Sequence, residues 1–166
     1  MPNWCSNSFK VSGSKEEIDS FENFLNEKDG KGWFDFFVKP ADEKNADWYS
    51  YNLENYGCKW NCDAQDWHRS ENTIEFWFDS PWGPPTKLYD FIQESGMIVE
   101  AEYMEEGMRF VGEYVDGIDD TYEYQEETDL EEIPEHLVEN WNLRDQFEPW
   151  EDEWKEEDEK DGKSNS

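Results

Sequence analysis

Hydrophobic and polar residues alternate most regularly between Thr73 and Asp79, within the densest aromatic stretch of the chain. A period of two is typical of a strand with one buried face. The apolar face carries Ile74, Phe76 and Phe78, and the other face carries Thr73, Glu75, Trp77 and Asp79. We expect this strand to lie at the centre of the core.

The wider segment, residues 57–96, predicts a strand, a turn, this central strand, a tight loop and a helix. Pro84 and Pro85 suit the first turn of the helix, where a missing N–H is harmless. Gly96 is expected to end the helix. The apolar stripe of the helix consists of Leu88, Phe91 and Ile92.

A strand followed by an amphipathic helix opens the chain. In the strand, Cys5, Asn7, Phe9 and Val11 alternate with Trp4, Ser6, Ser8 and Lys10. Ser14 and Glu17 then form a capping box, and the helix is expected to end near Asp29-Gly30. Its apolar face carries Ile18, Phe21, Phe24 and Leu25.

Residues 30–56 predict an insertion with little regular structure. The aromatic stretch 32–39 is stopped by Pro40, which favours an extended and partly buried segment. The polar start of residues 41–56 indicates a loop, and a short helix is expected before the turn at Gly57. That helix would carry Trp48, Tyr51, Leu53 and Tyr56.

Three strands are expected after the second helix. Met97, Val99, Ala101 and Tyr103 share one face of the first, and turns at 105–107 and 116–117 lead into strands over 108–115 and 121–125. The predicted order is β-α, an insertion, β-β-α-β and a hairpin. We therefore predict an α+β fold over residues 1–128, a ferredoxin-like split βαβ sandwich with an antiparallel sheet and two helices on one face.

Residues 129–166 predict an acidic, partly helical C-terminal extension. A helix can start at Ile133-Pro134-Glu135 and carry Leu137, Val138 and Trp141. A second helical stripe, interrupted by Pro149, consists of Leu143, Phe147, Trp150 and Trp154. The acid-rich run 151–161 is expected to be solvated.

Acidic residues dominate the composition. The 166 residues include 44 Asp and Glu against 14 Lys and Arg, which gives a net charge of -30. Residues 97–166 alone contribute -21 of this charge. Such a surface repels nucleic acid and anionic membrane and favours a basic protein partner. The hydrophobic fraction is 35%, but aromatic residues make up 17%, enough to expect a folded core.

The cysteine pattern indicates a reducing compartment. There are three cysteines, an odd number, and Met1 is not followed by a basic and then an apolar leader segment. No stretch approaches the roughly 18 apolar residues of a membrane span. We expect a soluble, cytoplasmic protein.

Several short motifs resemble one known family. They are MPNWCSN at the start, Gly13, GCKWN at 57–61, DSPWGPP at 79–85 and EEGMRFVG at 105–112. In this order they resemble the Api-like small phage and plasmid proteins over roughly residues 1–124. The resemblance implies a ferredoxin-like domain, an accessory role and, for a phage protein, the host cytoplasm. It transfers no catalytic or binding residue, and the family's Trp-Ser-Pro-Pro loop is replaced by Ser-Pro-Trp-Gly-Pro-Pro at 80–85.

The sequence offers no clear catalytic, cofactor or metal constellation. Cys58, Cys62 and His68 share a face if they lie on one strand, but the two cysteines would then stand about 13 Å apart, too far for a zinc knuckle. His68 and His136 lie beside no nucleophile in a glycine-rich turn, and no phosphate-binding loop is present. We therefore expect a protein that is not an enzyme.

Two candidate binding surfaces remain. One is an aromatic patch formed by Trp4, Trp60, Trp77 and Trp82. We favour the alternative that the insertion covers these side chains, because soluble monomers rarely expose such patches. The other is an acidic segment with aromatic anchors, formed by Trp150, Glu151, Asp152, Glu153, Trp154, Glu156, Glu157, Asp158 and Glu159.

We expect a non-enzymatic accessory protein that binds a basic host or phage protein through its negative surface. In the extreme form, helical carboxylates about 6 Å apart would imitate the phosphates of a nucleic acid. One alternative is a tail that only solubilises the protein. Another is a module that binds a small ligand or peptide in an aromatic groove on the sheet.

Overall fold

The computed structural model describes residues 3–41 and 47–147. The chain divides into two compact units, Met1–Thr121 and Tyr122–Ser166. No helix within the described residues is long and apolar enough to cross a membrane.

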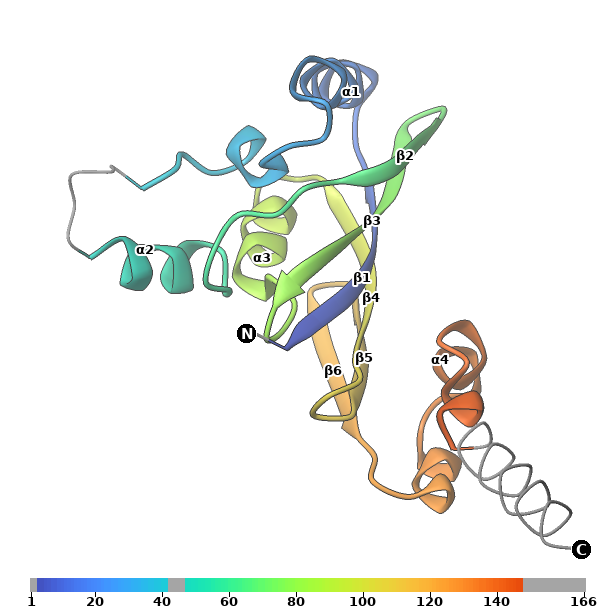
Figure 1. The fold of residues 1–166 in the computed structure, drawn as a ribbon. Helices are drawn as coiled ribbons and strands as arrows, with labels where there is room; N and C mark the ends of the chain where they lie inside the picture. The colour runs from blue at the N-terminus through green and yellow to red at the C-terminus, as the bar shows by residue number, and fades with distance from the viewer. Residues whose placement is uncertain (1–2, 42–46, 148–166) are drawn as a thin grey trace, which may run out of the picture. The chain divides into compact units, whose positions relative to one another are not determined.

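Six strands form one antiparallel sheet (Figure 1). The spatial order is β2-β3-β1-β4-β5-β6. β1 pairs with β3 and with β4, β2 pairs with β3, and β4 pairs with β5. The strands are β1 Trp4–Ser12, β2 Gln65–Ser70, β3 Thr73–Pro81, β4 Ile98–Glu105, β5 Phe110–Val115 and β6 Ile118–Glu123.

The predicted α+β class is confirmed. The six-stranded order differs from the four-stranded sheet of a split βαβ sandwich, because β5 and β6 extend the sheet beyond β4. Asp116 and Gly117 both have positive φ, as a tight two-residue hairpin turn between β5 and β6 requires. The predicted hairpin is therefore present, although β6 begins earlier than expected.

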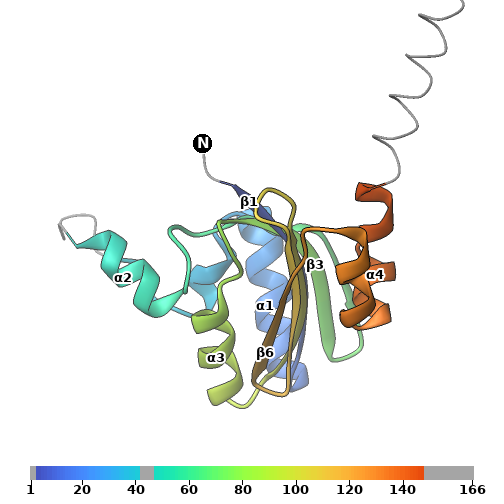
Figure 2. The ribbon, with the colours of Figure 1, turned by 90° about the horizontal axis from the view of Figure 1, so that it is seen from below.

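Two helices cover one face of the sheet (Figure 2). They are α1, Lys15–Lys28, and α3, Thr86–Glu94. A third helix, α2, spans Trp48–Asn55 within the insertion, as predicted. The alternation in β1, β3 and β4 is also confirmed, because the predicted apolar faces of all three strands are buried.

Trp33 stands at the centre of the core. Its side chain is fully buried and its ring contacts the rings of Phe9, Phe21, Phe34, Phe37, Phe76 and Phe78. The expected extended segment at 32–39 is wrong, since Trp33–Phe36 forms a 3-10 helix. In an extended chain, adjacent side chains point to opposite faces, whereas this turn lets both Trp33 and Phe34 enter the core.

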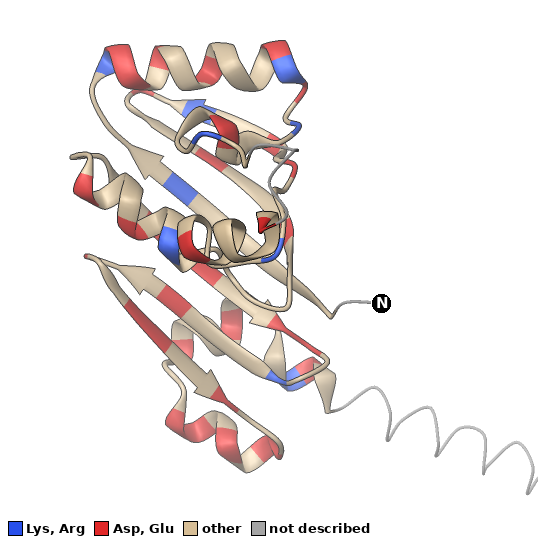
Figure 3. Cartoon of the chain, turned by 90° about the vertical axis from the view of Figure 1, so that its left-hand side faces the viewer, with Lys and Arg blue, Asp and Glu red and all other residues tan. Residues whose placement is uncertain are grey.

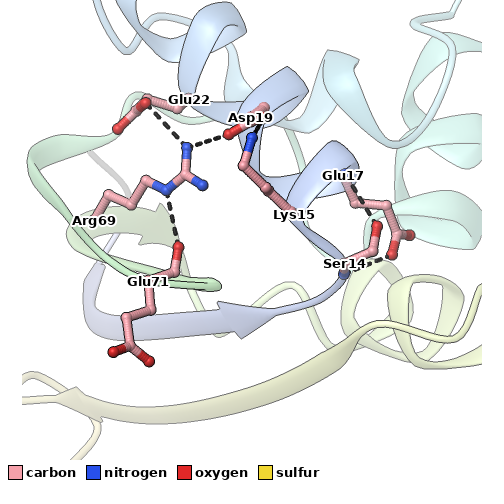
Figure 4. Close-up of polar contacts among 7 residues, drawn as sticks. All are labelled: Ser14, Lys15, Glu17, Asp19, Glu22, Arg69 and Glu71. Atoms are coloured by element: carbon pink, nitrogen blue, oxygen red, sulfur yellow. Dashed lines mark hydrogen bonds and ion pairs between the residues drawn. The ribbon is translucent and has the colours of Figure 1, made fainter.

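The N-terminus of α1 has the predicted capping box (Figure 4). The Ser14 hydroxyl accepts a bond from the Glu17 amide at 3.2 Å, and the Glu17 carboxylate accepts one from the Ser14 amide at 3.0 Å. One turn later, Arg69 on β2 donates to Asp19 and Glu22 at 2.5 and 3.2 Å. The pairing with Lys15, and then with Arg69, lowers the pKa of Asp19. These contacts fasten the edge strand β2 to α1.

Two further expectations are corrected. Residues 57–64 form a loop, not the beginning of a strand, because β2 starts only at Gln65. In α3, Leu88 and Ile92 are buried as predicted, but Phe91 is 48% exposed. Tyr89 is buried in its place, with its ring stacked on Phe9.

The described part of the second unit contains short helices. They are 3-10 helices at Glu127–Glu132 and Leu143–Gln146, and helix α4 at Glu135–Asn140. Within this unit, the Tyr124 hydroxyl donates to the side chain of Gln146 at 2.8 Å, and the Tyr124 ring contacts Phe147. Leu137, Val138 and Leu143 are buried, and the sequence pattern placed all three on apolar helical stripes. The predicted stripe residues Trp150 and Trp154 lie outside the described residues.

Phe76→Ala and Phe78→Ala are each expected to lower the free energy of unfolding by about 3–5 kcal/mol, because each removes a buried ring next to Trp33. Phe91→Ala is the matched control and should cost less than about 1 kcal/mol, since that ring is half exposed. Denaturant titrations of the three variants test which side chains of β3 and α3 face the core. Equal midpoints for Phe76→Ala and Phe91→Ala would contradict this orientation.

Truncation after Thr128 is expected to leave a chain that unfolds cooperatively. All six strands and both helices that cover the sheet precede this point. Circular dichroism during thermal unfolding is the measurement. A broad transition without a baseline would show instead that residues beyond Thr128 are needed for the sheet to form.

Candidate aromatic binding pocket

Three of the four tryptophans of the predicted patch are exposed, and Trp60 is partly buried. Trp4, Trp77 and Trp82 are 48%, 50% and 53% exposed. The favoured alternative, a second small core over them, is therefore wrong. The physical reason is that Trp33 and Phe34, two of the insertion's bulky apolar side chains, are used in the main core.

The structure brings two of the four tryptophans into contact. Trp4, at the start of β1, meets Trp60, in the loop before β2, with ring centroids 5.8 Å apart and planes at 64°. Trp77 lies on the same sheet face as Trp4 but is paired with Ser8 and Gln65 further along the sheet. Trp82 follows β3, where its amide donates to the carbonyl of Asn3 at 2.8 Å. The site is thus centred on Trp4 and Trp60.

A pocket of about 290 Å³ opens at the Trp4–Trp60 pair. Its lining is Trp4, Trp60, Asn61, Cys62, Asp63, Gln65 and Asp79. The lining includes two carboxylates and no Lys, Arg or His. Asp63 and Asp79 are both exposed, so the pocket combines indole rings with accessible negative charge.

Asn61 holds the pocket loop in place. Its side-chain oxygen accepts bonds from the amides of Phe34 and Cys62, at 3.1 and 2.8 Å. Its side-chain nitrogen donates to the Gly32 carbonyl at 3.3 Å and to Asp35 at 2.8 Å. Burial raises the pKa of Asp35, although this bond opposes the rise. The loop around Trp60 is therefore tied to the turn that carries Trp33.

Two further contacts join the same segments. The Asp63 carboxylate accepts a bond from the Gly32 amide at 3.0 Å, and the Trp33 amide donates to the Cys62 carbonyl at 3.1 Å. Gly30 has a positive φ, and a Cβ there would lie 2.4 Å from the Ala64 carbonyl oxygen. Only glycine permits this close approach of the two loops.

Cys58 and Cys62, of which Cys62 lines the pocket, are not separated along a strand as expected. Both thiols lie near the carbonyl oxygen of Trp60, with sulfur–oxygen distances of 3.3 Å for Cys58 and 3.6 Å for Cys62. Hydrogen bonding with Cys58, and then burial, raises the pKa of Cys62 well above its usual value. The turn formed by 58–62 brings the thiols together, whereas His68 lies on β2. Within 3–41 and 47–147, no three His, Cys, Asp or Glu side chains cluster as metal ligands would.

An exposed aromatic surface continues from the pocket to helix α2. The Lys59 ammonium lies 5.4 Å from the ring centroid of Trp60 and 5.9 Å from that of Tyr49. Tyr49 in turn meets Trp48 with ring centroids 6.0 Å apart, and both side chains are nearly half exposed. The sequence pattern predicted Trp48 on the apolar face of this helix. The helix instead buries Asn52, whose amide donates to the Lys59 carbonyl at 2.8 Å.

Other residues of the sequence motifs serve the fold near the pocket. Buried Asn7 donates to the Ser80 hydroxyl at 2.9 Å, and that hydroxyl donates to the Gly83 carbonyl at 2.6 Å. Buried Glu105 accepts bonds from the amides of Gly107 and Met108 at 2.6 and 2.7 Å, which closes the β4–β5 turn. These contacts give structural roles to parts of the MPNWCSN, DSPWGPP and EEGMRFVG motifs.

Negative charge is spread over the whole first unit (Figure 3). Residues 1–121 contain 26 Asp and Glu against 10 Lys and Arg, a net charge of -16. The charge is therefore not confined to the C-terminal extension. The predicted acidic binding segment, 150–159, lies outside the described residues.

Asn61→Ala is expected to lower the free energy of unfolding by about 1–3 kcal/mol, because the amides of Phe34 and Cys62 lose their acceptor. Asn23→Ala, at an exposed position of α1, is the control and should cause no loss. Urea titrations compare the two variants. Wild-type stability in Asn61→Ala would show that the loop does not depend on this side chain.

The comparisons with known proteins give one distant likeness. No family model matches the chain, and no curated protein matches it significantly. A solved structure described as protein api92 from Yersinia pseudotuberculosis, of the DUF1281 family, is similar at 13% sequence identity and a TM-score of 0.44. The match covers 76% of this chain and 99% of that chain.

Proposed function

We propose that this protein is a non-enzymatic binding module for a basic protein segment. One observation carries the proposal: the pocket at Trp4 and Trp60 exposes indole rings beside Asp63 and Asp79 on a unit of net charge -16. Interfaces commonly use aromatic side chains as anchors and charges to steer the partner. Both features are present on one surface.

The acidic C-terminal segment fits the same proposal as a second contact. It concentrates seven carboxylates between Glu151 and Glu159, with Trp150 and Trp154 as apolar anchors. Long-range attraction from these charges would bring a basic partner to the protein. A segment that imitates the phosphates of a nucleic acid is the extreme form of this proposal.

The fold and the sequence motifs support an accessory role. We infer that β4-β1-β3-β2 with α1 and α3 represents a ferredoxin-like core, to which β5 and β6 are added, because a split βαβ sandwich has this strand order. The resemblance to Api-like phage and plasmid proteins fits this inference. We propose that the protein acts in the host cytoplasm, where its three free cysteines remain reduced.

A small-ligand module is the second candidate, since a pocket exists. Pockets for drug-sized ligands measure about 300–1,000 Å³ and enclose most of the ligand. The pocket at Trp4 lies just below this range, with about 290 Å³. Its size therefore favours a single side chain of a protein partner.

Replacing Glu151, Asp152, Glu153, Glu156, Glu157, Asp158 and Glu159 by Gln or Asn should reduce the capture of basic proteins from a host lysate, because it removes seven negative charges. Capture by the wild type should also fall steeply between about 0.05 and 0.5 M salt. Affinity capture followed by mass spectrometry is the measurement. Circular dichroism must show that the variant remains folded.

The outcome separates the two surfaces. Unchanged, salt-sensitive capture by the tail variant would assign binding to the first unit and make the extension a solubilising segment. Capture that is insensitive to salt in both proteins would contradict the charge-driven proposal.

A further inference from the structure

We propose that the corner between Trp4 and Trp60 receives an arginine side chain of the partner, with Asp79 and Asp63 as its counter-charges. This inference rests on the proposed function and names the group that the pocket recognises. Three features of the pocket lead to arginine: its ring geometry, its charge and its size.

The ring geometry suits a planar cation. Trp4 and Trp60 stand at 64° with centroids 5.8 Å apart, so their surfaces form a corner instead of a closed stack. A guanidinium group stacks on an indole face and donates hydrogen bonds from its edge. In this corner it can lie against one ring while its methylene groups contact the other.

The charge of the lining selects a cation. Asp63 and Asp79 approach the pocket from the loop and from β3, and no basic residue lines it. The Gly32 amide fixes one oxygen of Asp63, so this carboxylate is held in position before a partner binds. Gln65 adds an amide oxygen as a further acceptor, whereas the Asn61 oxygen is already occupied by the amides of Phe34 and Cys62. Five donors on a guanidinium match this set better than the three of an ammonium.

Lys59 shows within the same chain that Trp60 contacts a cation. Its ammonium lies over the rings of Tyr49 and Trp60, yet Lys59 does not line the pocket. The pocket side of Trp60 therefore remains for a second cation. A volume of about 290 Å³ accommodates one long side chain. The loop is also preorganised by the four bonds of Asn61, which lowers the entropic cost of binding.

The test is a titration with N-acetyl-argininamide, followed through the indole N–H signals in proton–nitrogen NMR spectra. Saturable shifts are expected for Trp4 and Trp60. The citrulline analogue, which has nearly the same shape but no charge, should give no saturable shift. The lysine analogue should bind more weakly than the arginine probe. Equal binding of the citrulline analogue would overturn the proposal.

Matched variants locate the site. Asp79→Asn should weaken arginine binding roughly fivefold or more, whereas Glu75→Gln, an equal charge change on the same face of β3, should leave it unchanged. Trp4→Leu should abolish the shift of Trp60, whereas Trp82→Leu, at an exposed tryptophan outside the pocket, should not. If the two variants of either pair changed arginine binding equally, the probe would be attracted to the protein non-specifically. That result would overturn the assignment.

A separate measurement distinguishes this inference from the proposed function. Trp4→Leu and Asp79→Asn are tested for salt-sensitive capture of basic lysate proteins. If capture persists at the wild-type level, the module function stands and the arginine pocket is rejected. If capture falls in both variants but not in Glu75→Gln, the two proposals are supported together. If the wild type captures no basic protein while the arginine probe still binds, the partner proposal fails and the pocket assignment remains.

Discussion

The burial of Trp33 is the constraint on which the rest of the first unit depends. Its ring packs against aromatic side chains of β1, β3 and α1 and of its own 3-10 helix, so it joins the sheet, a covering helix and the insertion. A fully buried indole of this kind contributes several kcal/mol, on the order of 3–5 for loss to alanine. Because this burial draws the start of the insertion inward, the insertion is not available to cover the outer face of the sheet. The exposure of Trp4 and Trp77 follows from it.

The link between the core and the pocket is a set of polar contacts. Asn61 and Asp63 bind the backbone around Gly32, next to Trp33 itself. The position of Trp60 is therefore set by the same turn that completes the core. Among the described residues of the first unit, three buried polar atoms have no hydrogen-bond partner: the side-chain oxygen of Asn7, the indole N–H of Trp33 and the hydroxyl of Tyr89. The buried, unpaired N–H of Trp33 is an energetic cost of placing an indole at the centre of the core.

Local periodicity predicted most of the strands and helices of the first unit. Neighbouring residues encode the capping box at Ser14 and the buried strand faces that contain Phe9, Phe76 and Val99. These features can therefore be predicted directly from the sequence. The pocket could not be predicted, because it depends on contacts between 30–35 and 58–64, which are distant in sequence. The aromatic stretch at 32–39 suits a strand as well as a turn, and only its fit into the core decides between them. The GCKWN motif contained the signal for the anchor, Asn61, but not its partners.

The acidic surface has a consequence for the behaviour of the protein in concentrated solution. Half-exposed indole rings such as those of Trp4, Trp77 and Trp82 attract one another when two copies meet. A net charge of -30 opposes such encounters, because each copy repels the next over about a Debye length, roughly 8 Å in physiological salt. The charge thus opposes self-association through the exposed aromatic surface. Near the isoelectric point expected from the composition, about pH 4.1, that repulsion vanishes, and we expect the same rings to promote precipitation.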